Sequence, residues 1–171
     1  MRMKKLTFVL LAVLCLTGTA FAESKIGYVD LQKALNLSKA GVAAKTEISD
    51  LVKKYEDQFK QMQDDLKTQK SNLEKQAGIL SESARTDKER EYQQSVKELQ
   101  RFQKDVKDEL QAKDAEHTKR IINELFDILK KIGKDGGYTI ILEKNEGAVI
   151  YADESIDLTD QLIKTYDAAQ K

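Results

Sequence analysis

The one histidine in this sequence is the residue best suited to catalysis or metal binding. His117 follows Asp114 by three residues, so on a helix the imidazole and the carboxylate would share a face, as in carboxylate-bridged metal sites. Such sites need a second motif of this kind and further inward-facing carboxylates, and the chain offers a single histidine and a single cysteine. We therefore interpret His117 as a polar residue in a contact between helices, and we expect no metal.

The other charged side chains are typical of a solvated helical surface. Carboxylates are spread evenly along the chain and lie four residues from lysines, as in Glu56 with Lys60 and Asp127 with Lys131. The glycines of segment 133–137 precede a predicted strand, whereas a phosphate-binding loop would lead into a helix. These patterns predict that the protein is not an enzyme and binds no cofactor.

The N-terminus predicts a secretory signal peptide. Three basic residues among the first five precede an apolar run of about eleven residues and then the triplet Ala20-Phe21-Ala22. The run is shorter than the ~20 residues that a membrane-spanning helix needs. Cleavage after Ala22 would remove Cys15 and leave 149 residues with 26 basic and 29 acidic side chains, a net charge of −3. We expect an exported, cysteine-free protein.

The charge of the mature chain disfavours nucleic-acid binding. Between Ile48 and His117 the chain has 14 basic and 16 acidic residues. A protein that binds phosphate backbones needs a basic surface, which this balance does not provide.

Two heptad patterns predict a pair of long helices. Apolar residues recur at alternating intervals of four and three from Ile48 to Leu80 and again from Tyr92 to His117, and the chain has no proline to interrupt them. These positions form a seam along which the helices would meet. Four seam positions are polar and interrupt its apolar contacts: Gln69, Gln76, Gln103 and Lys113. Eight apolar seam positions are our candidates for holding the helices together and for contacting a bound chain: Tyr55, Phe59, Met62, Leu66, Tyr92, Val96, Leu99 and Val106.

The segment from Gly78 to Arg85 interrupts the heptads and predicts a turn near Ser83. The sequence Thr86-Asp87-Lys88-Glu89 matches a capping box, so we expect the second helix to begin there. Antiparallel pairing about this turn would place Leu66 near Leu99 and Phe59 near Val106. The middle of the chain is therefore a helical hairpin.

The two ends of the chain predict a small body that contains β-structure. A strand at 25–30 would be followed by a short helix at 31–37 with Asp30 as its cap, and Ser38 would cap the next helix. Gly133 is a plausible end of the second long helix. Each strand is too short to be stable alone, so the N-terminal strand is expected to pair with C-terminal strands. The expected C-terminal elements are strands at 138–142 and 148–152, and a last helix opened by Asp157 and Asp160.

Several segments of this sequence resemble the Skp/OmpH family of periplasmic chaperones. They are KIGYVDLQKAL near the mature N-terminus, then GYTIILEKN, AVIYA and DLTDQLIKTYD after the hairpin. The resemblance implies a jellyfish-like homotrimer in the periplasm, mostly α with a β-rich trimerisation body and three helical arms around a cavity. It also implies that unfolded outer-membrane β-barrel proteins are held there without ATP, with the outer-membrane assembly machinery as a further partner. The trimer interface that it implies contains Ile26, Tyr28, Val29, Ile140, Leu142, Val149 and Tyr151.

We accordingly divide the mature chain into a body of residues 23–47 and 120–171 and an arm of residues 48–119. Where relatives have a basic cluster linked with lipopolysaccharide, this arm has Asp105, Asp108, Glu109, Asp114 and Glu116, which argues against lipopolysaccharide binding. The alternative function is that of a helical spacer in a periplasmic envelope assembly, like the hairpins of adaptor proteins. Such adaptors have lipoyl-like halves beside the hairpin, for which the strands here are too short.

Overall fold

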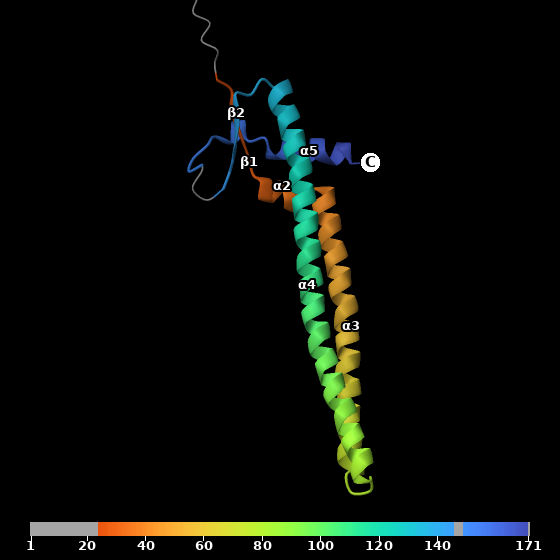
Figure 1. Cartoon of the computed structure of the whole chain (residues 1–171). Helices are drawn as coiled ribbons and strands as arrows, with labels where there is room; N and C mark the ends of the chain where they lie inside the picture. Colours follow the sequence, from red (N-terminus) through yellow and green to blue (C-terminus); the bar gives the residue numbers. More distant parts are fainter. Residues whose placement is uncertain (1–23, 146–148, 171) are drawn as a thin grey trace, which may run out of the picture.

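The computed structural model describes residues 24–145 and 149–170, and it shows a long two-helix arm projecting from a small body (Figure 1). The predicted signal peptide and its cleavage site after Ala22 lie outside the described residues. The elements, in chain order, are β1 (Ile26–Val29), α2 (Leu31–Leu37), α3 (Lys39–Gln76), α4 (Glu82–Asp135), β2 (Ile140–Glu143), η1 (Glu154–Ile156) and α5 (Thr159–Ala169).

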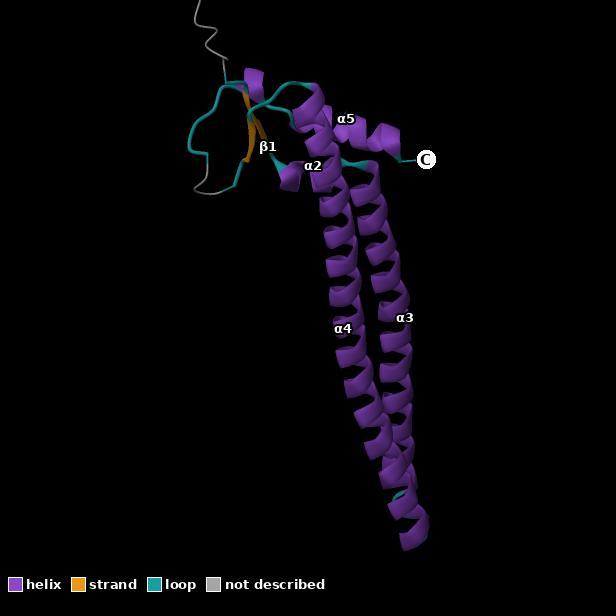
Figure 2. Cartoon of the chain, turned by 45° about the horizontal axis from the view of Figure 1, so that its top comes forward, coloured by secondary structure: helices purple, strands orange, loops and turns teal. Residues whose placement is uncertain are grey.

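The predicted helical hairpin is confirmed. Helix α3 has 38 residues and α4 has 54, and the two lie side by side along the arm (Figures 1 and 2). At ~1.5 Å per residue, α3 is about 57 Å long and α4 about 81 Å. The longer helix continues beyond the base of the arm and supplies one wall of the body. None of the described helices has a stretch that is both long and apolar enough to cross a membrane.

Two predicted helix caps position the base of the arm. The Asp30 carboxylate accepts a 2.7 Å hydrogen bond from the backbone amide of Lys33, and the Ser38 hydroxyl accepts one of 3.2 Å from the amide of Gly41. Because each side chain satisfies an otherwise unpaired amide, α2 can end and α3 can start in a new direction within two residues. Gly41 is buried at this bend, where a Cβ would lie 1.7 Å from the carbonyl oxygen of Leu35.

The predicted capping box at the tip of the hairpin is wrong. Helix α4 begins at Glu82, capped by Ser81, whose hydroxyl accepts a hydrogen bond from the amide of Ala84. The Thr86 hydroxyl instead donates to the Glu82 carbonyl inside the helix, and Glu89 pairs with Arg85 at 2.8 Å. The turn is shorter than predicted because Ser81 provides the cap five residues before Thr86.

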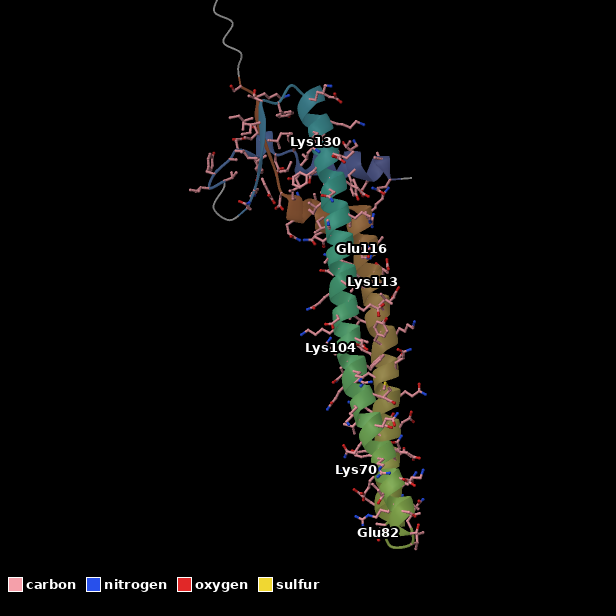
Figure 3. The ribbon with its side chains drawn as sticks, in the orientation of Figure 1. Lys70, Glu82, Lys104, Lys113, Glu116 and Lys130 are labelled. Carbon is pink, nitrogen blue, oxygen red and sulfur yellow. The ribbon has the colours of Figure 1, made fainter. Side chains whose placement is uncertain are left out.

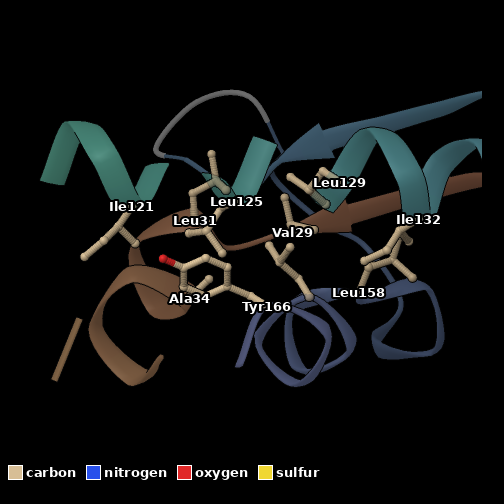
Figure 4. Close-up of a cluster of buried hydrophobic side chains, with 10 residues drawn as sticks. Val29, Leu31, Ala34, Ile121, Leu125, Leu129, Ile132, Leu158 and Tyr166 are labelled. Carbon is tan, nitrogen blue, oxygen red and sulfur yellow. The ribbon is translucent and has the colours of Figure 1, made fainter. Parts of the chain in front are cut away.

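The hydrophobic core lies in the body, between the last turns of α4 and the elements α2, α5 and β1 (Figure 4). The predicted end at Gly133 is wrong: α4 continues to Asp135, and the amide of Gly136 bonds to the Ile132 carbonyl at 2.9 Å. A Cβ at Gly136 would lie 2.6 Å from the ring of Tyr138, so the turn at this position requires glycine. The buried core residues are Val29, Leu31, Ala34, Ile121, Leu125, Leu129, Ile132, Leu158, Leu162 and Tyr166.

The ends of the chain pair, as predicted. Strand β1 runs parallel to β2, with Ile26 opposite Ile140 and Val29 opposite Glu143. The predicted strand at 148–152 is wrong for the residues that the structure describes there: 149–152 form an irregular segment, with Ile150 99% and Tyr151 86% exposed. A β-branched segment becomes a strand only beside a partner strand, and within this subunit no neighbouring described strand is paired with it.

Candidate functional site

The apolar seam of the arm is half-buried along its whole length. All eight candidate residues have intermediate exposure, and no residue between positions 42 and 120 is fully buried. Charged side chains extend outward from both helices around the seam (Figure 3). Two helices alone cannot enclose an interior, so every apolar side chain on the arm keeps a face that another chain could contact.

Contacts near the middle of the arm establish the register of the two helices. The Tyr55 hydroxyl donates a 2.7 Å hydrogen bond to the Glu109 carboxylate, and this bond, followed by desolvation, raises the pKa of Tyr55. Phe59 and Val106 line one cavity, which confirms their predicted proximity. Leu66 and Leu99 lie one heptad further towards the tip, and the same register places them opposite each other.

One seam residue was missed. The seam was predicted to pass through Gln103, but Gln103 is exposed and Phe102 is half-buried. The rings of Phe102 and Tyr55 pack edge to face, with centroids 6.0 Å apart and an interplanar angle of 76°. The signal was present in the sequence, since Phe102 lies three residues after Leu99 and four before Val106.

Two open cavities lie between the helices of the arm. The mid-arm cavity, of about 340 Å³, is mostly apolar and lined by Val52, Tyr55, Glu56, Phe59, Phe102, Gln103, Val106 and Leu110. The tip-side cavity, of about 720 Å³, is lined mainly by polar and charged side chains: Lys70, Leu73, Glu74, Thr86, Glu89, Arg90, Tyr92, Gln93, Gln94 and Lys97. The mid-arm cavity thus differs from the tip-side cavity in being lined mostly by apolar side chains, three of them aromatic.

His117 lies in the helix contact at the base of the arm, where we interpreted it to be. Its Nε2 is 3.3 Å from a Glu47 oxygen, while the Lys113 Nζ lies 3.7 Å from the other oxygen of the same carboxylate. Among the described residues, no group of three or more histidine, aspartate or glutamate side chains is arranged to hold a metal ion. The geometry thus shows His117 in a polar contact with Glu47 between α3 and α4.

The seven residues expected at a trimer interface fall into two sets. Tyr28 and Val29 are buried inside the subunit, at 4% and 2% exposure, so they shape the body from within. The other five lie on the surface or are half-buried: Ile26, Ile140, Leu142, Val149 and Tyr151. Phe126, which the sequence did not single out for an interface, is 43% exposed and lines a groove of about 420 Å³ with Ile140 and Leu142. The role of all these residues in assembly stays a prediction.

These features define a class of protein: a small α/β body that carries one long antiparallel helical arm with an incompletely buried apolar seam. Residues 25–166 match the family model described as outer membrane protein (OmpH-like), and the chain belongs to this family.

One known protein is similar to this chain in sequence, and one is similar in fold. The chain is 30% identical to a Skp-like protein of Pseudomonas aeruginosa over 167 residues, which covers 95% of this chain and 96% of that protein. Its fold matches the crystal structure of an OmpH-like protein from Caulobacter crescentus with a TM-score of 0.79 and 16% identity, over 85% of each chain. The resemblance recognised in the sequence is therefore confirmed at the level of family and fold.

Proposed function

We propose that this protein is an ATP-independent holdase chaperone of the periplasm, which keeps unfolded outer-membrane β-barrel proteins soluble between the arms of a homotrimer. The observation that carries the proposal is the arm itself: some 80 residues of helix hairpin without one fully buried side chain. A structure that served only to hold two helices together would gain stability by covering these residues.

An unfolded outer-membrane protein is a suitable client for such a surface. Its strands alternate apolar and polar residues, so it aggregates unless its apolar side chains are shielded. Half-buried seam residues offer many weak contacts, and three arms acting together would bind more tightly than one through avidity. Weak individual contacts also allow release, because insertion of the client into the membrane by the assembly machinery competes with them.

The body is the part of the chain suited to assembly. Ile26, Ile140 and Leu142 are 44%, 46% and 39% exposed on its small sheet, and Phe126 lies beside them across the groove. A two-stranded sheet is marginal on its own, and pairing of its edges with the irregular segment at 149–152 of another copy would extend it. In this arrangement residues 23–47 and 120–171 trimerise, and residues 48–119 extend as the client-binding arm.

The function is tested by diluting a urea-denatured outer-membrane protein into buffer that contains the purified mature chain and no ATP. We expect light scattering to fall and a soluble complex of three subunits with one client to elute on sizing. A spacer protein would leave the client to precipitate at any molar excess of the mature chain over the client. That result would refute the proposal.

A pair of variants tests whether the seam is the surface that binds the client. Phe59→Ser with Leu99→Ser removes apolar seam contacts and should weaken the protection against aggregation. Ile79→Ser is the matched control, because Ile79 is 83% exposed at the tip and lies outside the seam. Circular dichroism of each variant checks that the helices remain. Equal protection by the seam variant and the control would rule out the seam as the client-binding surface.

The trimer is tested on the protein alone by light scattering coupled to sizing. We expect three subunits for the mature chain, and smaller species for Ile140→Arg and Leu142→Arg, which place charge on the exposed body surface. A mature chain that remained monomeric at every concentration would overturn this part of the proposal.

A further inference from the structure

The mid-arm cavity combines space for a ring with aromatic surface that can pack against one. At about 340 Å³ it is roughly twice the size of a ~150 Å³ cavity known to hold one benzene. The Tyr55 and Phe102 rings pack edge to face, and aromatic rings favour such contacts at centroid separations of about 4.5–7 Å. A third ring can therefore enter beside this pair, next to the half-buried ring of Phe59.

Two carboxylates lie at the border of the mid-arm cavity. Of its eight lining residues, Glu56 is the one that carries a charge, and the Glu109 carboxylate lies immediately beside it, bonded to Tyr55. The bond from Tyr55 uses part of the acceptor capacity of Glu109, so the carboxylate keeps further lone pairs that can accept hydrogen bonds. Two negative charges thus border an otherwise apolar opening.

The half of the arm nearer the body also carries a net negative charge. Residues 48–66 and 98–117 contain seven basic and eleven acidic side chains, a net charge of −4, whereas residues 67–97 contain seven basic and five acidic ones, a net charge of +2. Two nearby lysines are already paired with carboxylates: Lys104 with Asp108 at 2.6 Å and Lys113 with Glu47 at 3.7 Å. A cationic group that approaches the mid-arm cavity is therefore attracted both by its border and by its surroundings.

We infer that the mid-arm cavity selects client segments in which an aromatic side chain is accompanied by lysine or arginine. The inference rests on the proposed chaperone function and names which segments of an unfolded chain its arm prefers. In an extended client, residues two apart lie on the same side and are separated by about 6.8 Å. An aromatic ring in the cavity would then place a basic residue two positions away near Glu56 or Glu109.

The tip-side cavity does not combine a mostly apolar lining with a border of carboxylates, so it provides an internal control. It is lined by three basic, two acidic and three uncharged polar residues, and Leu73 and Tyr92 are its apolar residues. A client segment bound there would gain little from carrying positive charge. The preference should therefore be lost when charge is removed at the mid-arm cavity and kept when the same change is made near the tip.

Tryptophan-containing peptides test the inference directly. The chain has no tryptophan, so indole fluorescence reports the peptide alone. Three Ser/Gly nonapeptides with one central Trp would carry Lys, Gln or Glu at both positions two residues from it, and each would be titrated with the mature protein. Two exposed ion pairs contribute about 0.2–1 kcal/mol each, so the Lys peptide should bind roughly two- to thirtyfold more tightly than the Gln peptide. The Glu peptide should bind least, and 0.5 M salt should reduce all the differences.

Charge-matched variants locate the effect. Glu56→Gln with Glu109→Gln should abolish the preference for the Lys peptide, since glutamine keeps an acceptor for Tyr55 but has no charge. Glu74→Gln with Glu89→Gln at the tip-side cavity is the control and should leave the preference in place. Equal binding of the three peptides, a preference for the Glu peptide, or an unchanged preference in the Glu56/Glu109 variant would each overturn the inference.

The wild-type protein is assayed in parallel for suppression of client aggregation, which separates the two proposals. Suppression without peptide selectivity contradicts the inference about the cavity and leaves the chaperone function intact. Failure of suppression contradicts the function itself.

Discussion

The Tyr55 hydroxyl on α3 donates its 2.7 Å hydrogen bond across the seam to the Glu109 carboxylate on α4. The other polar side-chain contacts between these helices lie nearer the body, where Glu47 meets Lys113 and His117. Beyond Tyr55 towards the tip, the described residues make no further side-chain hydrogen bond or ion pair between α3 and α4. The arm is thus tied by polar contacts at its base and by weaker contacts towards its tip.

Amide hydrogen exchange should reveal this gradient of stability. Local opening costs least where buried apolar contacts are few, so we expect protection to fall along α3 and α4 from the base of the arm to the tip. Uniform protection along both helices would contradict this prediction.

The bond from Tyr55 predicts a local effect of Tyr55→Phe. The variant loses one exposed hydrogen bond, which solvent weakens, and keeps the ring that packs on Phe102. Exchange should therefore accelerate near the middle of the arm and remain unchanged in the core helix α5. Peptide binding at the mid-arm cavity should persist, because the ring is still present; loss of binding would show that the hydroxyl matters more than the ring.

Gly41→Ala should be among the most damaging small substitutions in this chain. An added Cβ would lie 1.7 Å from the backbone carbonyl oxygen of Leu35, which cannot move without separating α2 from α3. We expect a loss of ~3 kcal/mol or more, seen as a large fall in the melting temperature by circular dichroism.

Gly78→Ala is the control for this change. Nothing lies within 4 Å of a Cβ at Gly78 near the tip, and its backbone does not have a positive φ. The substitution should be neutral or stabilise by up to ~1 kcal/mol, because alanine restricts the unfolded chain. Similar melting temperatures for the two variants would show that the bend at Gly41 relaxes.

The parts of this fold that the sequence predicted well are those set by local chemistry. Helix α2 has the predicted bounds because Asp30 and Ser38 cap both of its ends. The register of the arm followed from the heptads, since a spacing of four and three allows one pairing around a short turn. The family followed from the order of the segments.

The parts that were missed depend on contacts between distant segments. Helix α4 continues through Gly133 because its last turns pack on the body. The low helix propensity of glycine predicts an end there, since propensity takes no account of packing. The segment at 149–152 has strand-forming residues, yet a strand also needs a neighbour. Phe102 was passed over because a strict heptad favoured Gln103, although the larger apolar side chain occupies the seam.

Tyr166 predicts how the stability of the body depends on pH. Burial raises its pKa above the ordinary value, and its hydrogen bond to the Glu124 carboxylate acts in the same direction. The folded protein thus keeps this proton where the unfolded chain, with a tyrosine pKa of ~10, releases it. The stabilising contribution is complete below about pH 10 and declines as the pH rises towards the folded-state pKa. Tyr166→Phe should show a weaker decline between pH 9 and 11 in urea unfolding; identical slopes would contradict this role.

Leu125 and Phe126 are neighbours on α4 with opposite environments, and they separate the stability of the subunit from that of the assembly. Leu125 is fully buried, whereas Phe126 is 43% exposed. Leu125→Ala should cost about 2–5 kcal/mol because it leaves a cavity in the core, and this loss should appear at every protein concentration. Phe126→Ala should leave the folded subunit nearly unchanged but weaken its association, so its melting temperature should lie below that of the wild-type trimer where the wild type is associated and approach the wild-type value on dilution. Thermal unfolding of both proteins at two concentrations a hundredfold apart distinguishes these cases, and a Phe126→Ala melting temperature equal to the wild-type value at both concentrations would remove Phe126 from the interface.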